Sequence, residues 1–177
     1  MKTKPNSLAN IKLIISDVDG VLTDGKIYLD SSGGEIKVFT NRDALRIDIW
    51  LRNGGKMLWF TGRKSEAVKR RVSELNVDLI FKEDVIGDFL SQISKKYSLK
   101  PEEMAYVGDD WNDIYYMSRV GLSVAPASAS KENRAMANIV TKACGGAGVI
   151  AEIIEILMRK QGTWDKHVVA YKEKFIL

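Results

Sequence analysis

The sequence has one histidine, one cysteine and no long hydrophobic run, and each of these scarcities excludes a class of protein. With His167 as the sole histidine, a Ser-His-Asp triad, a Cys-His pair or a multi-histidine zinc site within one chain is all but excluded. Cys144 has no second cysteine with which to form an internal disulfide, which fits a reducing cytoplasm. Hydrolytic chemistry in this chain must therefore use carboxylates, hydroxyls, lysines and arginines.

No apolar run approaches the roughly 20 residues that a membrane-spanning helix needs. Residues 1–10 are polar and lack the hydrophobic segment of a signal peptide, so we expect a cytoplasmic protein without a membrane partner. The net charge is only +4, and basic knots such as residues 69–71 are typical of a solvated helix face. Basic and aromatic residues are not interleaved, so a small acidic molecule is a better expected partner than nucleic acid.

The 177 residues, 45% hydrophobic and 28% charged, suit one globular domain with a substantial core. Apolar runs typical of buried strands occur at residues 11–15, 56–60, 104–107 and 121–124. Helical spacing occurs at residues 42–53, 65–75, 85–97 and 150–158. Strands that alternate with helices predict an α/β fold with a doubly wound parallel sheet. We expect the domain to span residues 1–162.

Two segments depart from this alternation. Residues 26–29 and 35–39 are short β-like runs around a Ser- and Gly-rich turn, which predicts a β-hairpin inserted at about residues 26–39. The tail, residues 163–177, mixes Trp164, Tyr171 and Phe175 with charged residues. It is expected either to be a loose end or to pack on another subunit.

Three polar motifs each follow an apolar strand directly. They are Asp17-Val18-Asp19-Gly20-Val21, Thr61-Gly62-Arg63 and Gly108-Asp109-Asp110-Trp111-Asn112-Asp113. Alone, each motif would be a loop turn, a helix cap or an acidic helix start. Together and in this order, they would converge at the carboxyl edge of a parallel sheet. Carboxylates crowded in this way require a cation, and an all-oxygen site favours Mg²⁺.

These motifs resemble the first, second and fourth motifs of the haloacid dehalogenase superfamily. From about residue 11 to residue 157, the chain is similar to the superfamily's capless branch of sugar-acid phosphatases. That branch includes octulosonate 8-phosphate and nonulosonate 9-phosphate phosphatases. The resemblance extends to the hairpin and to the glycine-rich loop at residues 145–148. It implies a domain without a cap.

The resemblance implies a phosphoryl transfer in which Asp17 is the nucleophile and Asp19 the general acid and base. It places Mg²⁺ between the side chains of Asp17 and Asp109 and the backbone carbonyl of Asp19. The resemblance also implies that Asp110 and Asp113 orient the metal ligands. Thr61 and Gly62 would hold the phosphoryl group.

For the substrate, the resemblance implies a small sugar-acid phosphate. It carries over Arg42, Asp43, Arg63 and Arg71 as candidate contacts, and arginine binds carboxylates bidentately. Arg63 matches the octulosonate type. Capless relatives are expected to be homotetramers in which the hairpins form a central barrel and a neighbouring subunit completes each active site.

The chain departs from the family pattern where the third motif has a lysine, because counting back from Gly108 leads to Gly87. Lys82 is one candidate for the missing charge, and Lys166 or Lys172 of a neighbouring subunit's tail is another. Ala147 also stands where relatives have a basic or polar residue. The alternative hypothesis is a catalytically weak oligomerisation or regulatory domain, like those fused to sialic-acid cytidylyltransferases. A phosphomutase or dehalogenase is a minor hypothesis, since a dehalogenase would need neither Asp19 nor the metal.

Overall fold

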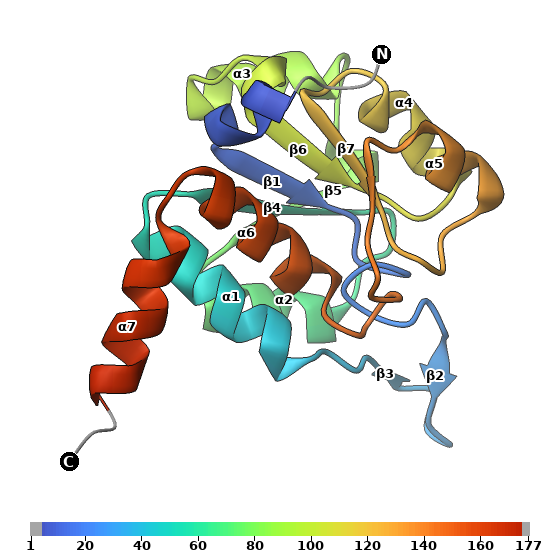
Figure 1. The fold of residues 1–177 in the computed structure, drawn as a ribbon. Coiled ribbons are helices and arrows are strands. Elements are labelled where there is room, and N and C mark those ends of the chain that lie inside the picture. The colour runs from blue at the N-terminus through green and yellow to red at the C-terminus, as the bar shows by residue number, and fades with distance from the viewer. Residues whose placement is uncertain (1–4, 175–177) are drawn as a thin grey trace.

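A computed structural model describes residues 5–174, which form a six-stranded sheet with helices on both faces (Figure 1). The strand order is β5-β4-β1-β6-β7-β8, and every neighbouring pair is parallel. The strands are β1 (Leu13–Ser16), β4 (Lys56–Thr61), β5 (Asp78–Phe81), β6 (Met104–Val107), β7 (Leu122–Ala125) and β8 (Ile139–Val140). The order reverses at the central β1, so the predicted doubly wound parallel sheet is confirmed.

Both faces of the sheet are buried because successive strand residues point to opposite sides. On β4, Met57 and Trp59 join the core beneath α1 (Asn41–Arg52), α2 (Glu66–Leu75) and α6 (Val149–Lys160). Leu58 and Phe60 join the second core, beneath α3 (Phe89–Tyr97), α4 (Ile114–Met117) and α5 (Lys131–Met136). A strand that is buried on both faces has a continuous apolar sequence, which explains the runs seen in the sequence.

The third predicted helix begins later than expected. Helical spacing from Val85 predicted a helix over residues 85–97, but α3 begins at Phe89. Gly87 has a φ of +81°, in the left-handed region, and the Asp88 side chain caps the helix by accepting from Ser91 N at 3.0 Å. These two residues end the preceding loop. The prediction for residues 85–88 was therefore wrong.

The tail forms a helix, α7 (Trp164–Lys174), as far as the structure describes it. Trp164 is buried in the core, and the guanidinium of Arg46 lies 5.0 Å from its ring centroid. The interpretation as a loose end is therefore wrong for residues 164–168, where Trp164 and Val168 pack on the core, and Phe175 lies outside the described residues. Packing of the tail on another subunit stays a prediction. Short 3₁₀ helices occur at η1 (Pro5–Asn10), η2 (Lys82–Asp84), η3 (Pro101–Glu103) and η4 (Trp111–Asp113).

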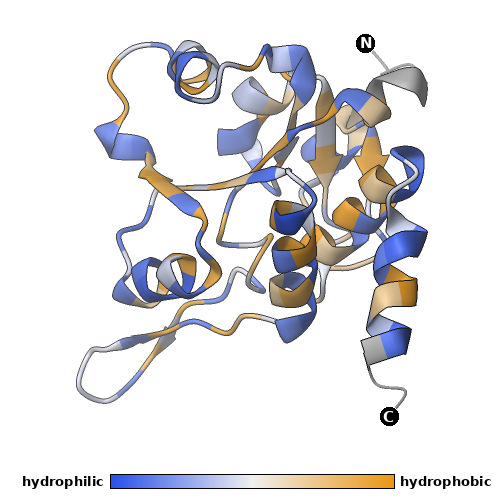
Figure 2. Ribbon diagram, turned by 90° about the vertical axis from the view of Figure 1, so that its left-hand side faces the viewer, coloured by the Kyte–Doolittle hydropathy of each residue, from blue (hydrophilic) through white to orange (hydrophobic). Residues whose placement is uncertain are grey.

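The predicted hairpin is a separate antiparallel pair, β2 (Tyr28–Leu29) with β3 (Glu35–Ile36), that projects from the body of the molecule (Figure 2). Residues alternate along its second strand: Glu35 and Lys37 are partly buried, whereas Ile36 and Val38 are exposed. The described residues contain no cap domain over the strand ends. No helix within residues 5–174 combines the length and apolar character needed to cross a membrane.

Candidate active site

The loops that follow β1, β4 and β6 meet at the carboxyl edge of the sheet. Asp17 directly follows β1, and its N–H donates to the carbonyl of Val107 on β6 at 3.0 Å. Thr61 ends β4, and Asp109 follows β6 by two residues. A cleft of about 280 Å³ opens there. It is lined by Asp17, Asp19, Gly25, Thr61, Gly62, Arg63, Asp109, Asp110 and Asn112.

Three carboxylates crowd together at the base of the cleft, two of them lining it and the third, Asp113, buried beneath. Asp17, Asp109 and Asp113 each offer an oxygen, and these oxygens lie within 4.8 Å of one another. Burial, followed by repulsion from Asp113, raises the pKa of Asp17 to about 7 and that of Asp109 to about 7. A set of oxygen donors with excess negative charge fits a hard divalent cation, which would favour the ionised carboxylates.

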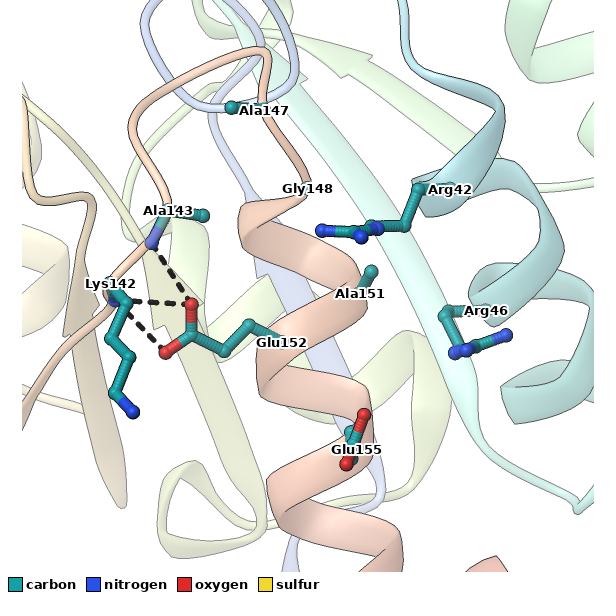
Figure 3. A pocket seen from close by; sticks show the side chains of 9 residues that line it. All are labelled: Arg42, Arg46, Lys142, Ala143, Ala147, Gly148, Ala151, Glu152 and Glu155. Atoms are coloured by element: carbon teal, nitrogen blue, oxygen red, sulfur yellow. Dashed lines mark hydrogen bonds between the residues drawn. The ribbon is translucent and has the colours of Figure 1, made fainter. Parts of the chain in front are cut away.

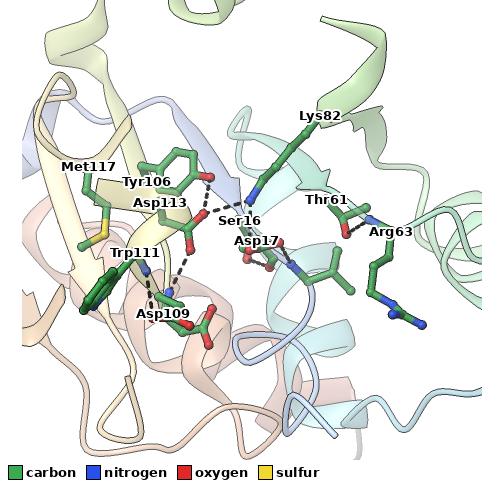
Figure 4. A network of polar contacts seen from close by, with 12 residues as sticks. Ser16, Asp17, Thr61, Arg63, Lys82, Tyr106, Asp109, Trp111, Asp113 and Met117 are labelled. Atoms are coloured by element: carbon green, nitrogen blue, oxygen red, sulfur yellow. Dashed lines mark hydrogen bonds and ion pairs between the residues drawn. The ribbon is translucent and has the colours of Figure 1, made fainter. Parts of the chain in front are cut away.

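Asp113 is the fully buried member of this cluster and lies at the centre of its polar contacts, which Figure 4 shows. One of its oxygens accepts from Tyr106 Oη at 2.9 Å and Lys82 Nζ at 3.1 Å, and the other accepts from Asp109 N at 3.0 Å. Because both of its oxygens accept from protein donors, Asp113 holds the side chain of Lys82 and the backbone of Asp109 in place. The side chains of Asp17 and Asp109 are left facing the cleft.

Two glycines allow the loops to approach this closely. Gly20 has a φ of +92°, and a Cβ added to it would lie 2.0 Å from Asp109 Oδ2. A Cβ added to Gly145 would lie 2.0 Å from the carbonyl oxygen of Gly20. The first motif, the acidic motif and the glycine-rich loop can therefore pack together only without side chains at these positions.

Lys82 supplies a positive charge beside the expected nucleophile. It follows β5, and its Nζ lies 3.2 Å from Asp17 Oδ2 and 3.1 Å from Asp113 Oδ1 (Figure 4). Burial by itself lowers the pKa of Lys82, but Asp17 and Asp113 raise it above its ordinary value, so the ammonium stays charged. Gly87 lies in open space, with nothing within 4 Å of an added Cβ. Of the lysines predicted as candidates for the missing charge, Lys82 is therefore the one that its own chain brings to Asp17.

Asp19 faces the same cleft and is held from the hairpin. Lys37 Nζ forms an ion pair with Asp19 Oδ1, and the side chain of Lys37 is only 3% exposed. Glu35 contacts both Lys37 and the guanidinium of Arg63. Sequence reasoning missed Lys37 and Glu35. The alternation that places residues 35 and 37 on one side of the strand was the signal that could have found them.

Of the four predicted substrate contacts, the structure brings only Arg63 to the cleft. Arg42 lines a separate cleft of about 460 Å³ together with Arg46, Ala147 and the start of α6 (Figure 3). Asp43 is buried and accepts from Ala151 N at 2.7 Å, which joins α1 to α6. Arg71 lines a small pocket together with Asp43 and pairs with Glu74 on the surface. In this chain, Asp43 therefore has a structural position and not one in the cleft.

Asp110 lines the cleft but is exposed, and its side chain caps η4 by accepting from Trp111 N at 2.9 Å. A doubly wound sheet with aspartates after β1, a threonine at the end of β4, a partly buried lysine after β5 and acidic residues after β6 defines a hydrolase of the haloacid dehalogenase class.

Comparisons with known proteins place the chain more closely. Residues 87–153 match the haloacid dehalogenase-like hydrolase family. The 3-deoxy-D-manno-octulosonate 8-phosphate phosphatase KdsC of Escherichia coli K12 is 38% identical over 160 residues, which cover 89% of this chain and 84% of that protein. The chain therefore belongs to the haloacid dehalogenase-like hydrolases, in the family of these phosphatases, and is a phosphoric monoester hydrolase.

Solved structures agree with this placement. The 3-deoxy-D-manno-octulosonate 8-phosphate phosphatase from Moraxella catarrhalis, in complex with a magnesium ion, a phosphate ion and a KDO molecule, has a TM-score of 0.88 and 30% identity. The match covers 94% of this chain and 97% of that one. A probable yrbi family phosphatase from Pseudomonas syringae pv. phaseolica has a TM-score of 0.88 and 34% identity, covering 94% and 96%.

Proposed function

We propose that this protein is a Mg²⁺-dependent phosphatase that hydrolyses a small sugar-acid phosphate of the 3-deoxy-octulosonate 8-phosphate type through an aspartyl-phosphate. The observation that carries the proposal is the meeting of Asp17, Asp19, Thr61, Lys82 and Asp109 at one cleft. The similarity to phosphatases named for this substrate supports the choice of sugar acid.

In the first half of the reaction, an Asp17 oxygen bonds to phosphorus while the bond from phosphorus to the sugar oxygen breaks. Asp19 gives its proton to that departing oxygen. In the second half, water attacks phosphorus, the bond to Asp17 breaks, and Asp19 takes the proton from the water. Thr61 Oγ and the Gly62 N–H bind phosphoryl oxygens, and Lys82 offsets negative charge at Asp17.

The donors proposed to hold Mg²⁺ are the side chains of Asp17 and Asp109 and the backbone carbonyl of Asp19. Asp113 orients Asp109 from below, and Asp110 lies at the rim. Bound Mg²⁺ supplies positive charge that allows an anionic carboxylate and an anionic phosphate to approach each other.

Arg63, at the rim of the cleft, is proposed to contact the carboxylate of the sugar acid. The face of the hairpin opposite Glu35 carries Ile36, Val38 and Tyr28, which are 52%, 61% and 39% exposed, and Ile27 and Leu29 are exposed on the first strand as well. An exposed apolar face on a two-stranded ribbon suits an assembly interface, because such a ribbon is marginally stable alone. We propose a homotetramer in which the hairpins meet and a neighbour completes each site.

The test is release of phosphate from a panel of sugar-acid phosphates with and without Mg²⁺. We expect turnover that EDTA abolishes and Mg²⁺ restores, and we expect Asp17→Asn to reduce it to background. If no substrate turns over above the Asp17→Asn control, the chain is the oligomerisation or regulatory domain. That alternative was favoured by the glycine at position 87, whereas the ammonium of Lys82, 3.2 Å from Asp17 Oδ2, supports the phosphatase.

A further inference from the structure

Lys37 is buried although it lies on the projecting hairpin. Its side chain is 3% exposed, whereas the neighbouring Ile36 and Val38 are 52% and 61% exposed. Its ammonium lies between the carboxylates of Asp19 and Glu35, 3.5 Å from Glu35 Oε1. Glu35 Oε1 in turn lies 2.8 Å from Arg63 Nη2. A row of alternating charges therefore joins the first motif, the hairpin and the second motif.

Packing alone does not explain this ammonium. Removing a charge from water costs several kcal/mol, and an apolar side chain of similar volume often serves a buried position at least as well. Residues 36 and 38 show that this strand carries apolar side chains where it faces outward. The ammonium of Lys37 instead lies against Asp19, so the contact with Asp19 is the feature that calls for an explanation.

In the described part of the chain, the Asp19 carboxylate accepts a hydrogen bond from Lys37 alone. Its Oδ1 accepts from Lys37, and among residues 5–174 no other amide or side chain donates a hydrogen bond to it. Asp19 lies in a loop, and its side chain is 24% exposed. Without Lys37, rotation about the side-chain bonds would move the carboxylate among several rotamers.

We propose that Lys37 is a positioning residue for Asp19, which makes the hairpin part of the catalytic apparatus. The ion pair fixes one carboxylate oxygen and leaves the other directed to the oxygen that leaves phosphorus. Glu35, anchored by Arg63, fixes Lys37 in turn. This inference rests on the proposed function, since it assigns a role relative to the general acid.

Leaving-group dependence tests the proposal. The value of kcat/KM reports the steps up to transfer of phosphate to Asp17, and an alkyl phosphate needs a proton at its leaving oxygen, whereas p-nitrophenyl phosphate does not. For Lys37→Met, we expect kcat/KM for a sugar phosphate to fall about 10- to 100-fold, as for a misplaced catalytic group. For p-nitrophenyl phosphate, we expect a change within about threefold, because its leaving group needs no acid.

Lys26→Met is the matched control, because Lys26 is on the same hairpin with its side chain 73% exposed. Lys26→Met should leave kcat/KM unchanged on both substrates. Lys37→Arg should retain most of the wild-type kcat/KM on the sugar phosphate. Equal losses on both substrates, or no loss at all, would overturn the proposal. If Lys37→Met does not fold, as judged by thermal unfolding, Glu35→Gln provides the test. It should lower kcat/KM for the sugar phosphate selectively, by a smaller factor than Lys37→Met. A wild-type protein inactive on both phosphates would instead refute the proposed function.

Discussion

Lys82 places its ammonium between Asp17 and Asp113, in contact with both carboxylates. Because this charge is fixed and partly buried beside the expected nucleophile, Lys82→Met should lower kcat by about 10²- to 10³-fold, or roughly 3–4 kcal/mol. Steady-state phosphate release measures the loss. Lys64→Met is the control, because Lys64 is 57% exposed and pairs with Glu83 at the surface.

Gly87→Lys provides the complementary test. Gly87 has a φ of +81° and open space around it, so a side chain there would be strained and would not be directed by packing. With Lys82 already beside Asp17, the substitution should give no gain in activity. An increase of several-fold would show that Lys82 does not supply the charge of the third motif.

Among single residues, those that belong to a motif could be placed in the candidate site from the sequence. Isolated residues such as Lys37 could not. Asp17, Thr61 and Asp109 could be placed because each follows an apolar strand, and parallel strands bring their carboxyl ends together. Lys37 reaches the cleft through the hairpin, whose orientation depends on tertiary packing. Lys82 could be named only as a candidate, since the reach of a side chain is not visible in the sequence.

The junction of α1 and α6 depends on Asp43, whose carboxylate accepts from Ala151 N at 2.7 Å. Burial raises its pKa to about 6 from an ordinary value of 3.8. A carboxyl with a raised folded-state pKa stabilises the fold fully below about pH 4, and this contribution is lost as the pH rises through about 6. Asp43→Asn, which stays neutral and can still accept from Ala151, should therefore gain stability relative to wild type as the pH rises.

Urea unfolding of both proteins at pH 4.5 and pH 8 measures this difference. The free energy of unfolding of Asp43→Asn minus that of wild type should rise by about 1–3 kcal/mol between the two values, from the 1.4 kcal/mol that each pKa unit represents. Subtracting wild type removes the titration of the other carboxylates. A difference that stays constant with pH would show that Asp43 titrates in the folded protein as it does in the unfolded chain.

Among the elements, the long apolar or periodic segments were predictable and the short ones were not. β5 is half-buried throughout and β8 has only two residues, so neither has a strong sequence pattern. The apolar spacing of Val85 and Ile86 continued the pattern of α3 in the sequence. Backbone geometry at Gly87 and the cap at Asp88 end the helix, and local turn chemistry of this kind overrides periodicity.

At the scale of the whole molecule, the proposed tetramer forms through the outward face of the hairpin. Val38 is 61% exposed and lies on the same face as Ile36 and Tyr28. Val38→Glu would bury a charge without a partner if hairpins meet there, so the proposed tetramer should dissociate into smaller species. Size-exclusion chromatography with light scattering at micromolar concentration measures the change. Activity should fall with it, because a neighbouring subunit is proposed to complete the site.

Val169→Glu is the matched control, because Val169 is 49% exposed on α7, at the other end of the sheet from the cleft (Figure 1). It distinguishes assembly through the hairpin from assembly through the tail, the alternative that the sequence left open. If Val169→Glu dissociates the protein and Val38→Glu does not, the tail holds the subunits together. The hairpin would then be exposed in the assembly, and its inward ion pairs at Lys37 would have to hold it against the body of its own chain.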